Sequence, residues 1–175
     1  MTYFMSDVEA DGPAPGIFSM VSIGIVVVEP SLSRTFYGTF KPISDQWDPE
    51  ALAVSGFTRE QTLAFDDPKD VLLKLEAFIQ KHNVGRPTFI ADNNGFDWQW
   101  PNYYFHKFLG RNPFGYSSKN LGSIYNGFVK DCAASFKHLR KTKHDHHPVN
   151  DAKGNAEALL EIKNRGLKID LSFKG

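Results

Sequence analysis

Three apolar segments separated only by short turns dominate the first 42 residues of the chain. Residues 2–8 and 34–42 have the composition of strands, and residues 19–29 carry the strongest strand signal in the sequence. Gly-Pro-rich residues 12–16 form the first turn, and a Glu-Pro-Ser sequence beginning at residue 29 forms the second. Because parallel neighbours need a long crossover connection, these short turns predict three antiparallel strands.

The remainder of the chain alternates between helical and strand patterns. Residues 67–82 place apolar side chains at helical spacing, and residues 86–92 form a short apolar strand that would run parallel to its neighbour. Helices are also expected over residues 97–109 and 150–166, whereas the Gly-, Ser- and Asn-rich residues 112–128 indicate a loop with a helical turn. This order predicts an α/β fold with a mixed central sheet, three antiparallel strands followed by parallel strands. We expect one domain over residues 1–175, with a short tail at 166–175.

Composition narrows the class of protein. Twenty basic residues balance twenty acidic ones, so a nucleic-acid binder would have to concentrate its positive charge locally. The single cysteine, Cys132, excludes an internal disulfide framework and a multi-cysteine zinc site. The N-terminal residues lack the pattern of a signal peptide, and the longest apolar run is too short to span a bilayer. These features predict a soluble, cytoplasmic protein.

Two carboxylates, Asp7 and Glu9, stand two residues apart where the first strand ends. Residues at that spacing on a strand point to the same face of the sheet. Two neighbouring carboxylates resist burial unless a cation neutralises them, and Mg²⁺ or Mn²⁺ prefers such oxygen ligands. Asp7 and Glu9 therefore form either half of a metal site or a solvated acidic turn.

Two later segments supply possible partners. Asp97 follows the strand at 86–92 across an Asn-Asn-Gly turn, where it is either a site residue or a helix cap. Asp151 lies in the first turn of the last predicted helix, where the helix dipole alone would also favour a carboxylate. His146 precedes it and could take a proton from water, although the cluster of His144, His146 and His147 could equally be surface histidines or a weak zinc site.

Together these segments resemble the three motifs of the DEDD-type 3'→5' exonucleases, in the histidine variant called DEDDh. Asp7-Val8-Glu9 matches the family's Asp-x-Glu, and residues 92–97 match His-Asn-x-x-Phe-Asp. Residues 146–151 match His-x-Ala-x-x-Asp, and residues 54–65 resemble the segment that follows the third strand in the family. The resemblance spans residues 3–165 and implies a ribonuclease H-like fold, with helices on both faces of a mixed sheet.

The resemblance implies a two-metal mechanism. Asp7, Glu9, Asp97 and Asp151 would hold two divalent cations, Mg²⁺ or Mn²⁺, and His146 would be the general base. The reaction would release nucleoside 5'-monophosphates from 3' ends of single-stranded DNA or RNA. The alternative is a nucleic-acid-binding or proofreading accessory protein that acts with a polymerase partner. A zinc-binding protein that uses the histidine cluster ranks below both, and a homodimer is one option for the oligomeric state.

Substrate contacts are also expected near the motifs. The resemblance points to Phe57, and Asn93 and Lys143 are the other expected substrate contacts. Basic residues just before His146 could form the required positive patch or a solvated helix face: Lys137, Arg140, Lys141 and Lys143. Phe18, Trp98 and Tyr104 are further candidates for stacking on bases.

Three positions depart from the family pattern. Ala10-Asp11 replaces the Thr-Thr often found after the first motif, and Asp92 replaces a histidine in the second. Pro148 replaces an alanine in the third motif. The change at Asp92 is expected to be peripheral, whereas the other two bear on substrate and rate.

Overall fold

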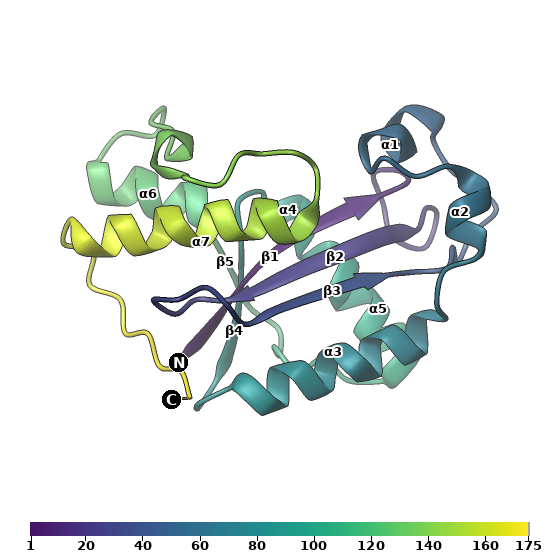
Figure 1. Cartoon of the computed structure of the whole chain (residues 1–175), viewed down its shortest axis with the longest axis horizontal. Coiled ribbons are helices and arrows are strands. Elements are labelled where there is room, and N and C mark those ends of the chain that lie inside the picture. Colours follow the sequence, from purple (N-terminus) through teal and green to yellow (C-terminus); the bar gives the residue numbers. More distant parts are fainter. Residues whose placement is uncertain (175) are drawn as a thin grey trace.

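A mixed sheet of five strands in the order β3-β2-β1-β4-β5 forms the centre of the molecule (Figure 1). The computed structural model describes residues 1–174. The strands are β1 (Thr2–Ala10), β2 (Met20–Val27), β3 (Thr35–Thr39), β4 (Pro87–Ala91) and β5 (Ser118–Asn120). β1, β2 and β3 pair antiparallel, whereas β4 pairs parallel with β1 and β5 parallel with β4. The predicted mixed sheet is confirmed.

Helices cover both faces of the sheet (Figure 1). The two longer helices of one face are α3 (Pro68–His82) and α5 (Gln99–Leu109), and α6 (Leu121–Val129) and α7 (Pro148–Asn164) lie on the other. The shorter elements are α1 (Pro49–Val54), α2 (Arg59–Leu63), α4 (Asn94–Asp97) and the 3₁₀ helix η1 (Lys137–Leu139). No helix within residues 1–174 is long and apolar enough to cross a membrane.

Alternation along β1 decides which side chains meet which layer. Phe4 and Val8 enter the core shared with α3 and α5, and Tyr3 and Met5 enter the core shared with α6 and α7. Because the side chains of a strand alternate between its two faces, Asp7 and Glu9 fall on the α7 face, in line with Tyr3 and Met5. The buried apolar row thus ends in two carboxylates.

Helix caps explain the elements that apolar spacing did not predict. Asp48 accepts hydrogen bonds from two amides at the start of α1, and Thr58 forms a capping box with Gln61 at the start of α2. α6 occupies part of the region expected to be a loop with a helical turn. Its cap is Asn120, which accepts a hydrogen bond from the amide of Ser123. Short capped helices leave little periodicity for a sequence reading to detect.

The C-terminal segment returns to the start of β1 (Figure 1). The Ser172 amide donates to the Met1 carbonyl at 2.9 Å, and the Thr2 hydroxyl donates to the Ser172 carbonyl at 2.7 Å. These bonds hold residues near both ends of the described chain at the start of the central strand β1, the end opposite Glu9.

Candidate active site

Three carboxylates from opposite ends of the sequence meet beside the sheet. Asp7 and Glu9 on β1 and Asp151 on α7 each offer an oxygen, and these oxygens lie within 4.8 Å of one another. Asp151 is 2% exposed, and the other two are partly buried. The pairing expected from the strand spacing therefore holds, because α7 covers the strand end and the carboxylates do not form a solvated turn.

Gly24 allows α7 to approach the sheet closely. It lies on β2 directly opposite Asp7. A Cβ at this position would lie 2.2 Å from the Pro148 carbonyl carbon and 2.3 Å from the Val149 nitrogen. Only a residue without a side chain leaves room for the first turn of α7, and that turn carries Asp151.

The loop before α7 orients the Asp151 carboxylate. The Asp145 amide donates to Oδ1 at 3.2 Å, and the His146 amide donates to Oδ2 at 3.1 Å. His146 has φ of +61°, a left-handed conformation that few residues other than glycine adopt. The turn at His146 therefore lets the loop present two amides to one buried carboxylate.

Asp97, at the end of the short helix α4 that follows β4, is the fourth carboxylate near Asp7, Glu9 and Asp151. Its Oδ1 accepts a hydrogen bond from the Val8 amide at 3.1 Å, and the residue is 4% exposed. Asp97 ends α4, so the expectation that it might cap the start of a helix is wrong; Asn93 occupies that position. The bond to Val8 places Asp97 next to the residue that separates Asp7 from Glu9.

Burial and the charges of neighbouring carboxylates make Asp7, Glu9 and Asp97 difficult to ionise. Burial, followed by the charges of Asp97, Glu9 and Asp151, raises the pKa of Asp7 well above its ordinary value. Burial and then Asp151 raise the pKa of Glu9 to about 7, and burial is the main cause that raises the pKa of Asp97 to about 8. Such oxygen donors suit a hard divalent cation, which would neutralise the charges and remove the repulsion.

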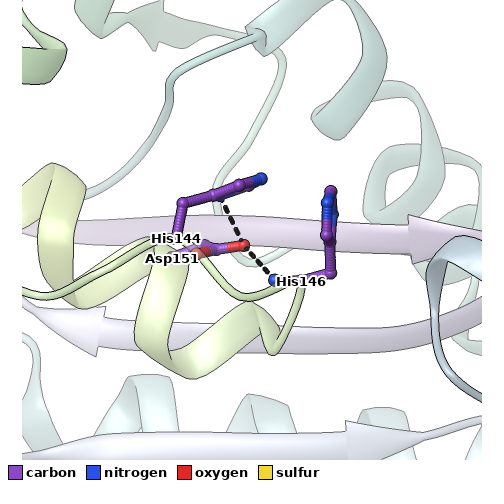
Figure 2. A group of neighbouring side chains, drawn as sticks. All are labelled: His144, His146 and Asp151. Carbon is purple, nitrogen blue, oxygen red and sulfur yellow. Dashed lines mark hydrogen bonds and ion pairs between the residues drawn. The ribbon is translucent and has the colours of Figure 1, made fainter.

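Two histidines flank Asp151 (Figure 2). The Nδ1 atom of His144 lies 2.8 Å from Asp151 Oδ2, and the Nδ1 atom of His146 lies 3.7 Å from Glu9 Oε1. The imidazole centroids are 4.3 Å apart, whereas His147 stacks on Tyr37 instead. Sequence reasoning selected His146 as the general base and named His144 only as one of three histidines in a possible weak zinc site. The His-x-His spacing was the available signal for His144, but only the turn at His146 brings both rings together.

Asp92 is not peripheral, which corrects that expectation. Its Oδ2 lies 2.9 Å from Arg140 Nη2 and 4.0 Å from Lys137 Nζ. Arg140 is largely buried, and its charge lowers the pKa of Asp7. Two members of the expected basic patch are therefore engaged by Asp92, while Lys141 and Lys143 are exposed.

An apolar hollow of about 470 Å³ lies directly beside Glu9. Its walls come from the segment after β1, from α1 and from α4: Ala10, Gly12, Pro13, Asp48, Ala51, Val54 and Phe96. Sequence reasoning singled out Ala10 as a departure from the family pattern but did not predict the hollow, because a wall formed by three separate segments has no local pattern.

The aromatic and polar side chains expected to contact substrate differ in their exposure to solvent. Phe57 is partly buried and packs edge-on against Phe65. Tyr104 is fully buried, and its hydroxyl accepts a hydrogen bond from the Met20 amide, so it is wrong as a stacking candidate. Phe18 and Trp98 pack against the core, and Asn93 is exposed at the start of α4.

Solved structures share this architecture. The nuclease domain of 3'hExo, a DEDDh family member solved with bound rAMP, superposes with a TM-score of 0.76 over 99% of this chain and 96% of its own, at 18% identity. A complex of Escherichia coli ExoI with single-stranded DNA gives a TM-score of 0.73 over 94% of this chain, at 16% identity. The matched region is 41% of the ExoI chain. The fold is that of the DEDD exonucleases.

Sequence comparison defines the family. Residues 2–163 match the 3'-5' exoribonuclease Rv2179c-like domain, and the chain belongs to this family of 3'→5' exonucleases. It is also 37% identical over 166 residues to the 3'-5' DNA exonuclease Cap18 of Escherichia coli, over 86% of each protein. The resemblance inferred from the three motifs is confirmed.

Proposed function

We propose that the protein removes nucleoside 5'-monophosphates one at a time from the 3' end of single-stranded DNA or RNA, using Mg²⁺ or Mn²⁺. The observation that carries this proposal is the convergence of Asp7, Glu9 and Asp151 within 4.8 Å, next to a hollow open to a ligand. We further propose that residues 1–175 act as one exonuclease domain, because β1 and α7 contribute ligands from both ends of the sequence.

Asp7, Glu9, Asp97 and Asp151 would hold two divalent cations. The pKa values of about 7 for Glu9 and about 8 for Asp97 support this assignment, since a cation would compensate the cost of ionising both groups. When bound, the cations supply positive charge at the scissile phosphate and make the attacking water more acidic.

His146 would accept the proton of the attacking water. Its side chain is 50% exposed and lies next to Glu9, so the ring is within reach of both solvent and the carboxylates. His147 is the less suitable base, because its ring stacks on Tyr37.

The hollow beside Glu9 would receive the terminal nucleotide. Ala51, Val54 and Phe96 offer an apolar surface to a base, and any base has a face that can pack there. Phe57 would contact the terminal nucleotide, and Asn93 and Lys143 would contact the sugar-phosphate chain. Lys143 is exposed and so can attract phosphates.

A 5'-labelled oligonucleotide assay tests the proposal. DNA and RNA of one sequence are incubated with Mg²⁺, with Mn²⁺ or with a chelator, and the products are resolved to one nucleotide. We expect stepwise shortening from the 3' end, metal dependence and nucleoside 5'-monophosphate products. The rate ratio for DNA over RNA decides between the two substrates named for the relatives.

Matched variants identify the residues responsible. Asp7→Asn and His146→Ala should retain binding of the oligonucleotide while losing hydrolysis, because both residues act mainly in the transition state. Asp45→Asn, which removes an exposed carboxylate, serves as the control and should leave the rate unchanged. Cleavage that survives chelation, or an Asp7→Asn enzyme as active as the control, would contradict the proposal.

A further inference from the structure

His144, His146 and Asp151 form a second group of possible metal ligands that overlaps the carboxylate site. An imidazole nitrogen of each histidine and an oxygen of Asp151 all lie within 4.8 Å of one another. The rings come from the loop before α7, and the carboxylate comes from its first turn (Figure 2). His144 has no part in the proposed reaction, yet it makes the shortest side-chain contact to Asp151.

The chemistry of this group differs from that of the carboxylates. Mg²⁺ requires oxygen ligands and is poorly served by imidazole, whereas Zn²⁺ and Co²⁺ bind two imidazoles and a carboxylate well. We propose that His144, His146 and Asp151 bind a transition-metal ion such as Zn²⁺, and that this ion inhibits the nuclease.

The site is largely preformed. Two backbone amides fix the orientation of the Asp151 carboxylate, as outer hydrogen bonds do at many metal sites. His144 Nδ1 already lies 2.8 Å from Asp151 Oδ2, so one cation could contact both atoms without a large rearrangement. Both rings are about half exposed, which leaves an entry path from solvent and room for a water molecule as the fourth ligand.

Inhibition follows from the two shared residues. A Zn²⁺ ion at this position would occupy the nitrogen lone pair with which His146 accepts a proton, and it would take an oxygen of Asp151 from the Mg²⁺ site. This consequence rests on the proposed function, whereas binding of the ion does not. His144 is the residue that separates the two states, since it is needed only for the transition metal.

Binding is tested first, on the full chain in excess Mg²⁺, with Co²⁺ as a visible probe and Zn²⁺ as its competitor. We expect wild-type protein to bind one Co²⁺ with the strong visible absorption of four-coordinate geometry, and Zn²⁺ to displace it. His144→Ala and His144→Gln should weaken Zn²⁺ binding by at least about 100-fold, the upper range for losing only an outer-shell partner. His147→Ala is the matched control, because its ring lies outside the group, and it should bind like wild type.

Inhibition is tested second, with the Mg²⁺-dependent assay. Zn²⁺ should inhibit wild type and His147→Ala, while His144→Ala should keep its Mg²⁺-dependent rate and resist Zn²⁺. Equal inhibition of wild type and His144→Ala, or unchanged Zn²⁺ affinity in His144→Ala, would overturn the inference. If no variant hydrolyses DNA or RNA, the proposed function fails, and the Co²⁺ absorption alone decides whether the metal site exists.

Discussion

At the scale of single residues, Asp7 illustrates the conflict between stability and chemistry. Its pKa is raised by burial and by neighbouring carboxylates, so the charged form destabilises the metal-free fold. Asp7→Asn should therefore increase the free energy of unfolding in chelator, because an asparagine at this position has no charged form to bury. It should also reduce hydrolysis by at least about 100-fold. Thermal denaturation and the nuclease assay measure both effects, with Asp45→Asn as a control expected to change neither.

Glu9 and Asp97 make the free energy of unfolding of the metal-free protein depend on pH. Their pKa values of about 7 and about 8 exceed the ordinary values of these side chains. Between the ordinary pKa and the raised pKa of each group, the folded state therefore binds more protons than the unfolded state. The stability contributed by these groups is therefore complete at about pH 4 and is lost as pH rises toward about pH 8. Urea unfolding in chelator at several pH values measures this slope.

Asp97→Asn is the control for that slope, since it removes one titrating group and should flatten the dependence. Saturating Mg²⁺ should flatten it as well, because the bound cation favours the ionised carboxylates. A metal-free protein whose stability increases over the same pH range would contradict the assignment.

The residues that sequence reasoning found and missed differ in how local their signals are. Asp7 and Glu9 could be placed together because strand spacing alone fixes their common face. The closeness of His144 to Asp151 depends on the loop that turns at His146, whose left-handed conformation is uncommon for any residue other than glycine. Arg140 and Asp92 are 48 positions apart in sequence, so their ion pair depends on the folded topology.

At the scale of elements, the contact between β2 and α7 sets the position of Asp151. Gly24→Ala would place a methyl group against the Pro148 backbone, and backbone cannot rotate away as a side chain can. We expect a loss of roughly 1–3 kcal/mol in the free energy of unfolding and a reduced rate of hydrolysis, since α7 must move away from β1. Urea denaturation and the nuclease assay measure these effects.

Gly127→Ala in α6 is the matched control for that substitution. A Cβ at Gly127 meets nothing within 4 Å, so alanine should stabilise the helix by about 0.5–1 kcal/mol. If both glycine variants behaved alike, close packing of α7 on β2 would not be what positions Asp151.

Helix α1 is predicted to affect substrate binding more than catalysis. Val54, at its last position, is 47% exposed and lines the hollow beside Glu9. Val54→Asp would remove apolar surface and repel phosphate, and a lost base contact of roughly 1–3 kcal/mol corresponds to roughly a 5- to 150-fold increase in KM. Steady-state kinetics on a short oligonucleotide would measure it. Leu63→Asp adds the same charge at an exposed position of α2 and should leave KM unchanged.

The elements were predicted with uneven success. α3 was predicted at its observed N-terminal cap and length, because a proline start and an apolar stripe coincide there. α1 and α2 were not expected as helices, since each is held by capping side chains and is too short to show a repeat. The hollow beside Glu9 was missed because its wall comes from three separate segments.

At the scale of the whole molecule, the proposed cations would link the first strand to the last helix. Asp7 and Asp151 are far apart in sequence, so unfolding must separate them and release any ion they share. Mg²⁺ at 100 times its dissociation constant should add about 2.7 kcal/mol to the free energy of unfolding. Denaturation at increasing Mg²⁺ tests this, and Asp151→Asn should abolish most of the gain. An equal gain in wild type and variant would place the stabilising ion elsewhere.

The pairing of Met1 and Thr2 with Ser172 has a practical consequence. Thr2 and Glu9 stand at opposite ends of β1, roughly 20 Å apart at the usual rise per residue. A tether attached near either end of the chain would therefore hold the molecule on a solid support with its carboxylates facing outward. Immobilised in that orientation, the protein would receive a long strand from solution without the support obstructing its path.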